Sequence, residues 1–451
     1  MAEKILQCGY MSGDTYAAAA CLALYPGSTL LLIQDTKERQ DKTGTIGKIY
    51  RECGVGASIK VRDLSKSTLK VKECWNAIKD KYKDGAPAPA RRPAGDLNVW
   101  LASMYNEKPI GWPRSITAVT GLVASQFESN ADAPKTVATA WKIGKLPTDM
   151  KFALWEYMAG KFRQIKFEIR NNIVVLWSRQ SAKHGGAHLE MDSSYAAIRQ
   201  LAARFSQNAT VLLTGDERNG KLAQIAAKYG NTIDVSNMWE AKSPIWRKET
   251  GEADNSAWGQ KFAGNTYLAQ FAFYKELAGD YNVIHLGMRS GMLESMALLG
   301  MKTFYMEPTN CGSGDRMLAF STAGIPYSRI QIGALPGLKS RAAQQIIEKD
   351  KQPVATLGMV DYRIRDITND LMKQPGFLQT FGGYNPRTRK YYPTQEAREA
   401  ATKLAKVGAA GDDTGTVNLA NIDEKVAAMR GFLDDDLKKI VAQVEAAFKH
   451  S

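Results

Sequence analysis

Arg289, Ser290 and Gly291 stand together where an apolar stretch gives way to a helical pattern. Residues 282–286 have the composition of a buried strand, and residues 290–299 that of a short helix for which serine is a favourable N-cap. The free N–H groups of such a helix N-terminus attract phosphate, and a guanidinium beside them adds positive charge. We therefore predict that this turn binds phosphate groups of a ligand. The competing interpretation is an ordinary capped helix with a surface arginine.

The elements around this turn form a βαβ unit. Gly300 suits the left-handed residue that closes a helix, and a second apolar run follows at residues 302–306. Strand, helix and strand in so short a stretch imply a parallel sheet with helices on its faces. Ligands of such sheets bind at the carboxyl ends of the strands, which is where the Arg289 turn would lie.

The segment LESMALLGMKTFY, which begins at Leu293, resembles the E-A-M-A-x-G-x-P-V segment in the second domain of GT-B glycosyltransferases. The resemblance implies that Glu294 hydrogen-bonds the ribose of a nucleotide-sugar donor and that the helix N-terminus holds the donor's diphosphate. The segment departs from the pattern by one additional residue before Gly300 and by Lys302 or Thr303 where proline is usual. The alternative for Glu294 is a first-turn acid that favours the helix dipole.

Three further positions complete the donor site that the resemblance implies. Arg179 and Lys183 follow an apolar strand at residues 173–178, on a loop that in this family often supplies basic residues to the diphosphate. Asp216 follows the strand at residues 209–214, where a carboxylate could bind a ribose or the edge of a base. The sequence GDERNG at that point is equally a plain turn.

The same loop carries His184, a candidate base in the active-site cleft, with a surface loop histidine as the alternative. His184 and His188 have the i, i+4 spacing of metal ligands, and Glu190 would be a third ligand. Gly185 and Gly186 disfavour the helix that this spacing requires, so we expect no metal.

The chain opens with the same order of elements. Residues 4–8 and 28–34 have the pattern of buried strands, and the run TYAAAACLALY between them has that of a helix. The connecting turn, GYMSGD, lacks the GxGxxG fingerprint of dinucleotide binding. By the same resemblance, any catalytic base lies on a loop at this end of the first domain, so Asp14 is the candidate base. The alternative for Asp14 is an N-cap or Asx-turn residue.

These units predict an α/β protein with two Rossmann-like domains that face a cleft, as in GT-B enzymes, and a helical C-terminal tail. The 451 residues allow an acceptor domain at residues 1–170, a nucleotide-sugar donor domain at 171–345 and a mostly helical extension at 346–451 that packs back on the domains. The polar, glycine-containing residues 37–48 are predicted to form a mobile loop.

Composition narrows the class of protein. No apolar run approaches the roughly 18 residues of a membrane span. The five cysteines form no CxxC pair, which argues against a disulfide framework or a structural zinc site and favours a cytoplasmic location. The formal net charge of +14 suits an anionic partner such as nucleic acid, a phosphorylated ligand or an anionic membrane, although solubility alone is an alternative.

Together these features predict a metal-independent glycosyltransferase with a nucleotide-sugar donor as co-substrate and a nucleic acid or another anionic molecule as acceptor. A nucleotide-sugar epimerase would share the fold and the donor site. A non-catalytic, basic nucleic-acid-binding protein would instead use segments such as NPRTRKYYP, residues 385–393, whose three basic residues and adjacent tyrosines resemble a nucleic-acid-facing patch.

Overall fold

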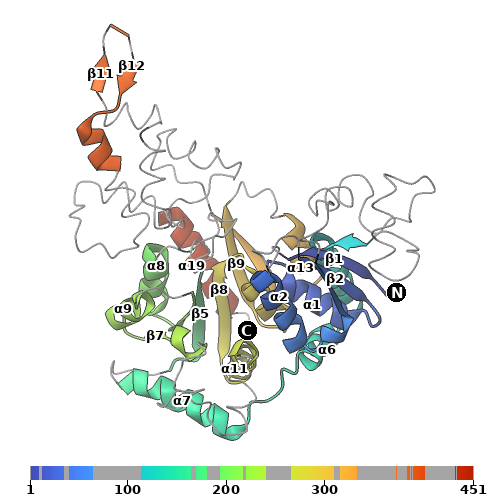
Figure 1. Ribbon diagram of the computed structural model, residues 1–451. Coiled ribbons are helices and arrows are strands. Elements are labelled where there is room, and N and C mark those ends of the chain that lie inside the picture. The colour runs from blue at the N-terminus through green and yellow to red at the C-terminus, as the bar shows by residue number, and fades with distance from the viewer. Residues whose placement is uncertain are drawn as a thin grey trace, which may run out of the picture.

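Figure 1 shows the computed structural model, in which helices cover two β-sheets made of parallel strands. The structure describes residues 2–9, 13–34, 40–63, 113–163, 169–179, 193, 195–216, 220–239, 266–308, 315–332, 372, 383–385, 387–388, 390–401, 432 and 434–449. The predictions made for Lys183, His184, His188 and Glu190 lie outside the described residues. The α/β class predicted from the sequence is confirmed.

The first sheet has four described strands in the order β3-β2-β1-β4, all parallel. They are β1 (Lys4–Cys8), β2 (Thr29–Gln34), β3 (Ile59–Asp63) and β4 (Arg114–Ser115). Its helices are α1 (Thr15–Leu24), α2 (Gln40–Glu52), α5 (Val119–Ser129) and α6 (Ala133–Ala140), with short 3-10 turns η2 (Gly56–Ser58) and η4 (Ile116–Ala118). The nearly unbroken leucines of β2 are buried, as expected for a strand covered on both faces.

Helix α2 corrects the prediction of a mobile loop at residues 37–48, because the chain is helical from residue 40. Thr43, Ile46 and Tyr50 are buried at helical spacing and form the face that packs on the sheet. Gly44 and Gly47 lower the helix propensity of the segment and mask this pattern in the sequence. Burial of one face therefore outweighs a poor local propensity.

The second sheet has six parallel strands in the order β10-β9-β8-β5-β6-β7. They are β5 (Asn172–Ser178), β6 (Thr210–Gly215), β7 (Thr232–Asp234), β8 (Asn282–Met288), β9 (Thr303–Pro308) and β10 (Tyr327–Ile332). Numbered by their place in this half of the chain, they follow the 3-2-1-4-5-6 order of the doubly wound nucleotide-binding fold. The order reverses between β5 and β8, where such folds have their ligand-binding crevice.

Helices cover both faces of this sheet, as Figure 1 shows. They are α8 (Tyr195–Phe205), α9 (Lys221–Lys228), α11 (Thr266–Asp280), α12 (Gly291–Leu298), α13 (Leu318–Thr322) and α19 (Asp434–Lys449), with 3-10 turns η7 (Ser236–Trp239) and η8 (Asp315–Met317). Along β5, Val175 and Trp177 join the core with α11 and α12, whereas Leu176 joins the opposite core with α8, α9 and α19. This alternation is that of a strand buried on both faces.

Helix α19 packs against α8 and the outer face of the six-stranded sheet. Its Ile440 and Val444 are buried, and Lys302 Nζ donates to the carbonyl oxygen of Ala447 at 2.8 Å. Helix α19 thus covers part of the second sheet beside α8, and the packing of the extension at residues 346–451 as a whole stays a prediction.

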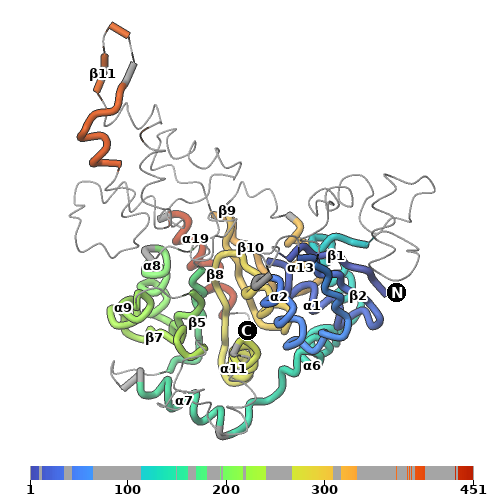
Figure 2. The backbone as a smooth tube through the Cα atoms, in the orientation of Figure 1, coloured from blue at the N-terminus to red at the C-terminus, as the bar shows by residue number. Residues whose placement is uncertain are grey.

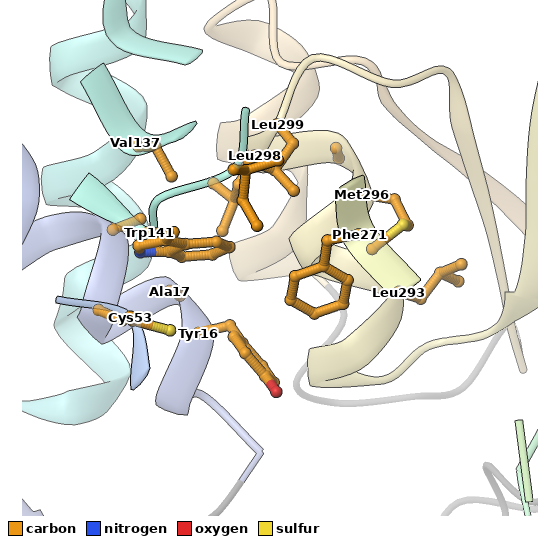
Figure 3. Close-up of a cluster of buried hydrophobic side chains, with 14 of the residues drawn as sticks. Tyr16, Ala17, Cys53, Val137, Trp141, Phe271, Leu293, Met296, Leu298 and Leu299 are labelled. Atoms are coloured by element: carbon orange, nitrogen blue, oxygen red, sulfur yellow. The ribbon is translucent and has the colours of Figure 1, made fainter. Parts of the chain in front are cut away.

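The two sheets share one hydrophobic core. Helix α7 (Thr148–Arg163) leads from the first to the second, as the tube in Figure 2 traces. Figure 3 shows Tyr16 of α1 and Trp141 close to Phe271 of α11, with Met296 of α12 beside them. The Tyr16 ring centroid lies 5.5 Å from that of Phe271 and 5.8 Å from that of Trp141. Because this core is continuous, the limits at 170 and 345 stay a prediction.

A two-stranded antiparallel hairpin, β11 (Gly383–Asn385) and β12 (Lys390–Tyr392), stands apart from both sheets in Figure 1. It carries part of the NPRTRKYYP segment, and the side chain of Tyr392 is 49% exposed. Among the described helices, none combines the length and apolar character needed to cross a bilayer.

Candidate functional site

Two predicted cations meet at the point where the strand order of the six-stranded sheet reverses. Arg179 directly follows β5 and Arg289 directly follows β8, which are neighbouring strands. Arg179 Nη1 donates to the backbone carbonyl oxygen of Arg289 at 2.5 Å. The sequence placed these residues on separate loops, and the strand order brings them together at the carboxyl edge of the sheet.

The N-terminus of α12 begins at this edge. Ser290 has an extended backbone, and its Oγ accepts a hydrogen bond from the Leu293 N–H at 3.2 Å, which confirms the predicted N-cap. Gly300 closes the helix with a φ of +85°, also as predicted. A Cβ added to Gly291 would lie 2.2 Å from the carbonyl oxygen of Gly13. Glycine is therefore needed here because the loop after β1 packs directly on the first turn of α12.

A buried carboxylate holds Arg289 in place. Arg289 Nη1 lies 2.9 Å from Glu307 Oε2, and the Glu307 side chain is fully buried at the end of β9. Arg329 on the neighbouring strand β10 forms an ion pair with the other oxygen of Glu307. The Arg289 side chain is only 10% exposed. Arg289 is therefore not the surface charge of the alternative interpretation.

Glu307 and Arg329 were not recognised in the sequence. The available signal was a charged residue two positions after Tyr305, on the same face of an otherwise apolar strand. Pairing Arg289 with Glu307 requires the adjacency of β8 and β9, which the βαβ unit predicts. Pairing Arg329 with the same carboxylate requires β10 to lie next to β9 in parallel register.

Asp14 comes from the first sheet but pairs with a residue of the second. It directly precedes α1, and its side chain caps none of the described N–H groups of that helix. Instead Asp14 Oδ1 lies 2.5 Å from Arg316 Nη2. Arg316 Nη1 also donates to the carbonyl oxygen of Thr117 at 3.5 Å. Asp14 thus stands at the N-cap position of α1, which is the alternative interpretation. Its carboxylate, however, forms an ion pair with Arg316 from the second half of the chain.

Glu294 lies within this group of charges. Its side chain is buried, and its Oε2 has no hydrogen-bond partner in the part of the chain that the structure describes. Burial, reinforced by the negative charge of Asp14, raises the pKa of Glu294 to about 8, although Arg316, Arg289 and Arg179 oppose the rise. Burial thus favours the protonated form of this carboxyl group, which can donate as well as accept a hydrogen bond.

Asp216 lies one strand further along the same edge. Its backbone N–H donates to the carbonyl oxygen of Ser178 at 2.9 Å, next to Arg179. The structure thus gathers predicted residues from both halves of the chain around Glu294, namely Asp14, Arg179, Arg289, Ser290 and Gly291. Within the described ranges, no cluster of three or more His, Cys, Asp or Glu side chains could hold a metal ion.

The fold and the site define an α/β protein with two sheets of parallel strands. The C-terminal ends of strands from both sheets lie close to one cluster of arginine, aspartate and glutamate side chains. No protein-family model matches the chain, and no curated protein matches its sequence. Among solved structures it is similar to the heptosyltransferase WaaC of E. coli, solved with ADP-2-deoxy-2-fluoro heptose, with 11% sequence identity. The match covers 78% of this chain and 100% of that chain, with a TM-score of 0.26. At this TM-score the similarity carries no argument about activity.

Proposed function

We propose that the protein is a metal-independent glycosyltransferase of GT-B type that binds a nucleotide-sugar donor at the carboxyl edge of the six-stranded sheet. One observation supports this above the others: at the reversal of strand order, Arg179 and Arg289 meet the capped N-terminus of α12 beside buried Glu294. Crevices at this point of a doubly wound sheet bind nucleotides, and helix N-termini with fixed cations bind phosphate.

Each residue has a role in donor binding. The diphosphate lies against the N-terminus of α12 and the guanidinium groups of Arg179 and Arg289, with Lys183 as a further cation. The Glu294 carboxyl group hydrogen-bonds a ribose hydroxyl, because a buried polar atom without a partner is costly unless a ligand satisfies it. Asp216 binds a second ribose hydroxyl or the edge of the base. Glu307 does not touch the ligand and fixes the position of Arg289.

The reaction would be substitution at the anomeric carbon of the sugar. A hydroxyl, amine or carboxamide of the acceptor forms the new bond as the bond to the diphosphate oxygen breaks, and the diphosphate leaves with the electron pair. The transition state is oxocarbenium-like, and the arginines with the helix N-terminus stabilise the charge that develops on the leaving group. Asp14, or His184, accepts the proton of the nucleophile.

The acceptor would be a nucleic acid or another anionic molecule, since the net charge of +14 exceeds what a diphosphate alone requires. In this proposal residues 1–170 bind the acceptor, residues 171–345 bind the donor, and residues 346–451 form the extension. The NPRTRKYYP segment, whose Tyr392 is exposed, would offer stacking and phosphate-binding groups to a nucleic-acid acceptor.

A thermal-shift screen against nucleoside diphosphates and nucleotide sugars tests the donor site. A ligand at 100 times its dissociation constant adds about 2.7 kcal/mol of stability to the native protein. We expect at least one nucleoside diphosphate to raise the melting temperature. The effect should be lost in Arg289→Gln and kept in Arg398→Gln, which changes an exposed arginine far from the site in the sequence.

Four outcomes would count against the proposal. The absence of any nucleotide-dependent shift, or a shift that Arg289→Gln leaves intact, would remove the donor site. Conversion of the donor sugar to its epimer in the absence of acceptor would identify the epimerase class instead. Salt-sensitive binding to DNA or RNA without any nucleotide-sugar turnover, unaffected by Arg289→Gln, would identify a non-catalytic nucleic-acid-binding protein.

A further inference from the structure

Arg316 reaches from the second half of the chain to the point at which the first sheet reverses its strand order. It lies in η8, which follows β9 in the second half of the chain. Its guanidinium contacts Asp14, after β1, and the carbonyl oxygen of Thr117, after β4. In the described order β3-β2-β1-β4, the reversal lies between β1 and β4. Arg316 therefore reaches from the sheet proposed to bind the donor into the crevice position of the other sheet.

The backbone that carries Arg316 is fixed, while its side chain retains access to solvent. Phe320 of α13 is buried against Tyr327 at a centroid distance of 6.0 Å, and Tyr327 stacks on Tyr305 at 4.3 Å. By contrast, the Arg316 side chain is 30% exposed. Its long side chain can therefore change partner without any movement of the sheet.

Within the described part of the chain, Arg316 has one carboxylate partner and lies close to a helix N-terminus that attracts anions. On one side is the Asp14 carboxylate, in direct contact. On the other are Glu294 and the N-terminus of α12, whose first turn touches the Gly13 backbone next to Asp14. A phosphate group bound at α12 would thus arrive close to the Asp14–Arg316 ion pair. Phosphate competes well with a single carboxylate for a guanidinium because it offers more charge and bidentate geometry.

We propose that Arg316 is a positioning residue that exchanges Asp14 for a phosphate group of the donor when the donor binds. This inference rests on the proposed function. The exchange forms and breaks only non-covalent contacts: the guanidinium leaves Asp14 Oδ1 and pairs with a phosphate oxygen. Asp14, no longer neutralised, then accepts the proton of the nucleophile. The base is therefore released only when the leaving group is in place.

A thermodynamic cycle with inorganic pyrophosphate as the probe tests the exchange. Its four proteins are the wild type, Asp14→Asn, Arg316→Gln and the double variant, and the affinity is measured by calorimetry. Asp14→Asn removes the competitor for Arg316, so pyrophosphate should bind about fivefold or more tightly than to the wild type. Arg316→Gln should weaken binding, and Asp14→Asn in the Arg316→Gln background should then have no further effect.

The cycle also separates the exchange from a general charge effect. If Asp14→Asn tightens binding equally with and without Arg316, the gain is long-range electrostatics and the exchange is wrong. The same holds if Asp14→Asn leaves the affinity unchanged or lowers it. Arg316→Lys keeps the charge without the bidentate geometry and should retain part of the affinity. If Arg316→Lys is as stable as the wild type but binds pyrophosphate no better than Arg316→Gln does, the charge of residue 316 does not contribute to phosphate binding.

Failure of the proposed function gives a different result. If wild-type protein binds neither pyrophosphate nor any nucleoside diphosphate, the donor site and the exchange are both overturned. If wild-type protein binds pyrophosphate and Arg289→Gln abolishes that binding, but Asp14 and Arg316 show no coupling, the donor site stands and only the exchange is lost.

Discussion

Gly13 and Gly291 touch across the junction of the two sheets. The first belongs to the loop after β1 and the second is the first helical residue of α12, and the carbonyl oxygen of Gly13 occupies the space that a Cβ at residue 291 would need. This contact brings Asp14 close to the N-terminus of α12. The catalytic arrangement that we propose therefore depends on a backbone contact between parts of the chain far apart in sequence.

Gly291→Ala should destabilise the protein, because the added methyl group would overlap the Gly13 carbonyl group at 2.2 Å. We expect a loss of about 1–3 kcal/mol in the free energy of unfolding, measured by denaturant titration. Gly121→Ala in α5 is the matched control, since among the described residues no atom beyond its own stretch of helix backbone lies within 4 Å of the added Cβ. That helical substitution should be neutral or stabilise by up to about 1 kcal/mol. Equal effects of the two substitutions would contradict the contact.

Glu294 should make stability depend on pH. Its pKa is raised from 4.5 to about 8 in the native protein, so the native state keeps a proton that the unfolded chain loses between these values. Stability that is present below pH 4.5 is therefore lost as the pH rises towards 8, with a slope of at most about 1.4 kcal/mol per pH unit. Glu294→Gln cannot titrate and should reduce this slope in unfolding titrations between pH 5 and 8. Parallel pH profiles for the two proteins would show that Glu294 is ionised throughout.

Glu307→Gln should cost about 3 kcal/mol or more, because it leaves the buried guanidinium groups of Arg289 and Arg329 without their common counter-charge. The comparison is Glu276→Gln, which breaks a pair of similar length, 2.7 Å to Lys151, where both side chains are partly exposed. That change should cost less than about 1 kcal/mol. Chemical unfolding measures both, and similar costs would mean that Glu307 is not the anchor of Arg289.

Trp141→Ala should destabilise both sheets together. The indole is fully buried between α1 and α11 and contacts Tyr16 and Phe271, so its removal leaves a cavity in the shared core. We expect a loss of about 3–5 kcal/mol with a single unfolding transition, followed by calorimetry and by tryptophan fluorescence. Two separated transitions, of which only one shifts, would show that the units at residues 1–170 and 171–345 fold independently.

Several elements were predictable because their signals are local. The strand at residues 4–8 was predicted with the bounds that β1 has. Ser290 and Gly300 were recognised as the two ends of α12, because a side-chain cap and a left-handed closing residue depend on a few neighbouring residues. Arg289 was selected because it stands beside a predicted helix N-terminus, and Arg179 because the family resemblance implies basic residues on the loop after residues 173–178.

Other features depend on contacts that no local pattern contains. Helix α2 is formed because Ile46 and Tyr50 are buried against the first sheet, although two glycines weaken its propensity. For Asp14 the sequence offered a catalytic base, with an N-cap or Asx-turn residue as the alternative, and only the tertiary structure pairs its carboxylate with Arg316, 302 residues away. Glu307 acquired its role only when β8, β9 and β10 became neighbours.

The amino-acid sequence alone thus determined the α/β class and the positions of elements such as β1, β8 and α12, since composition, periodicity and capping act over a few residues. The tertiary structure decided which charges are paired. The order of parallel strands selects which carboxyl ends are adjacent, and that order is set by the packing of whole helices on both faces of each sheet. The same packing buries Glu294 and raises its pKa, because the energy of a charge depends on everything that surrounds it.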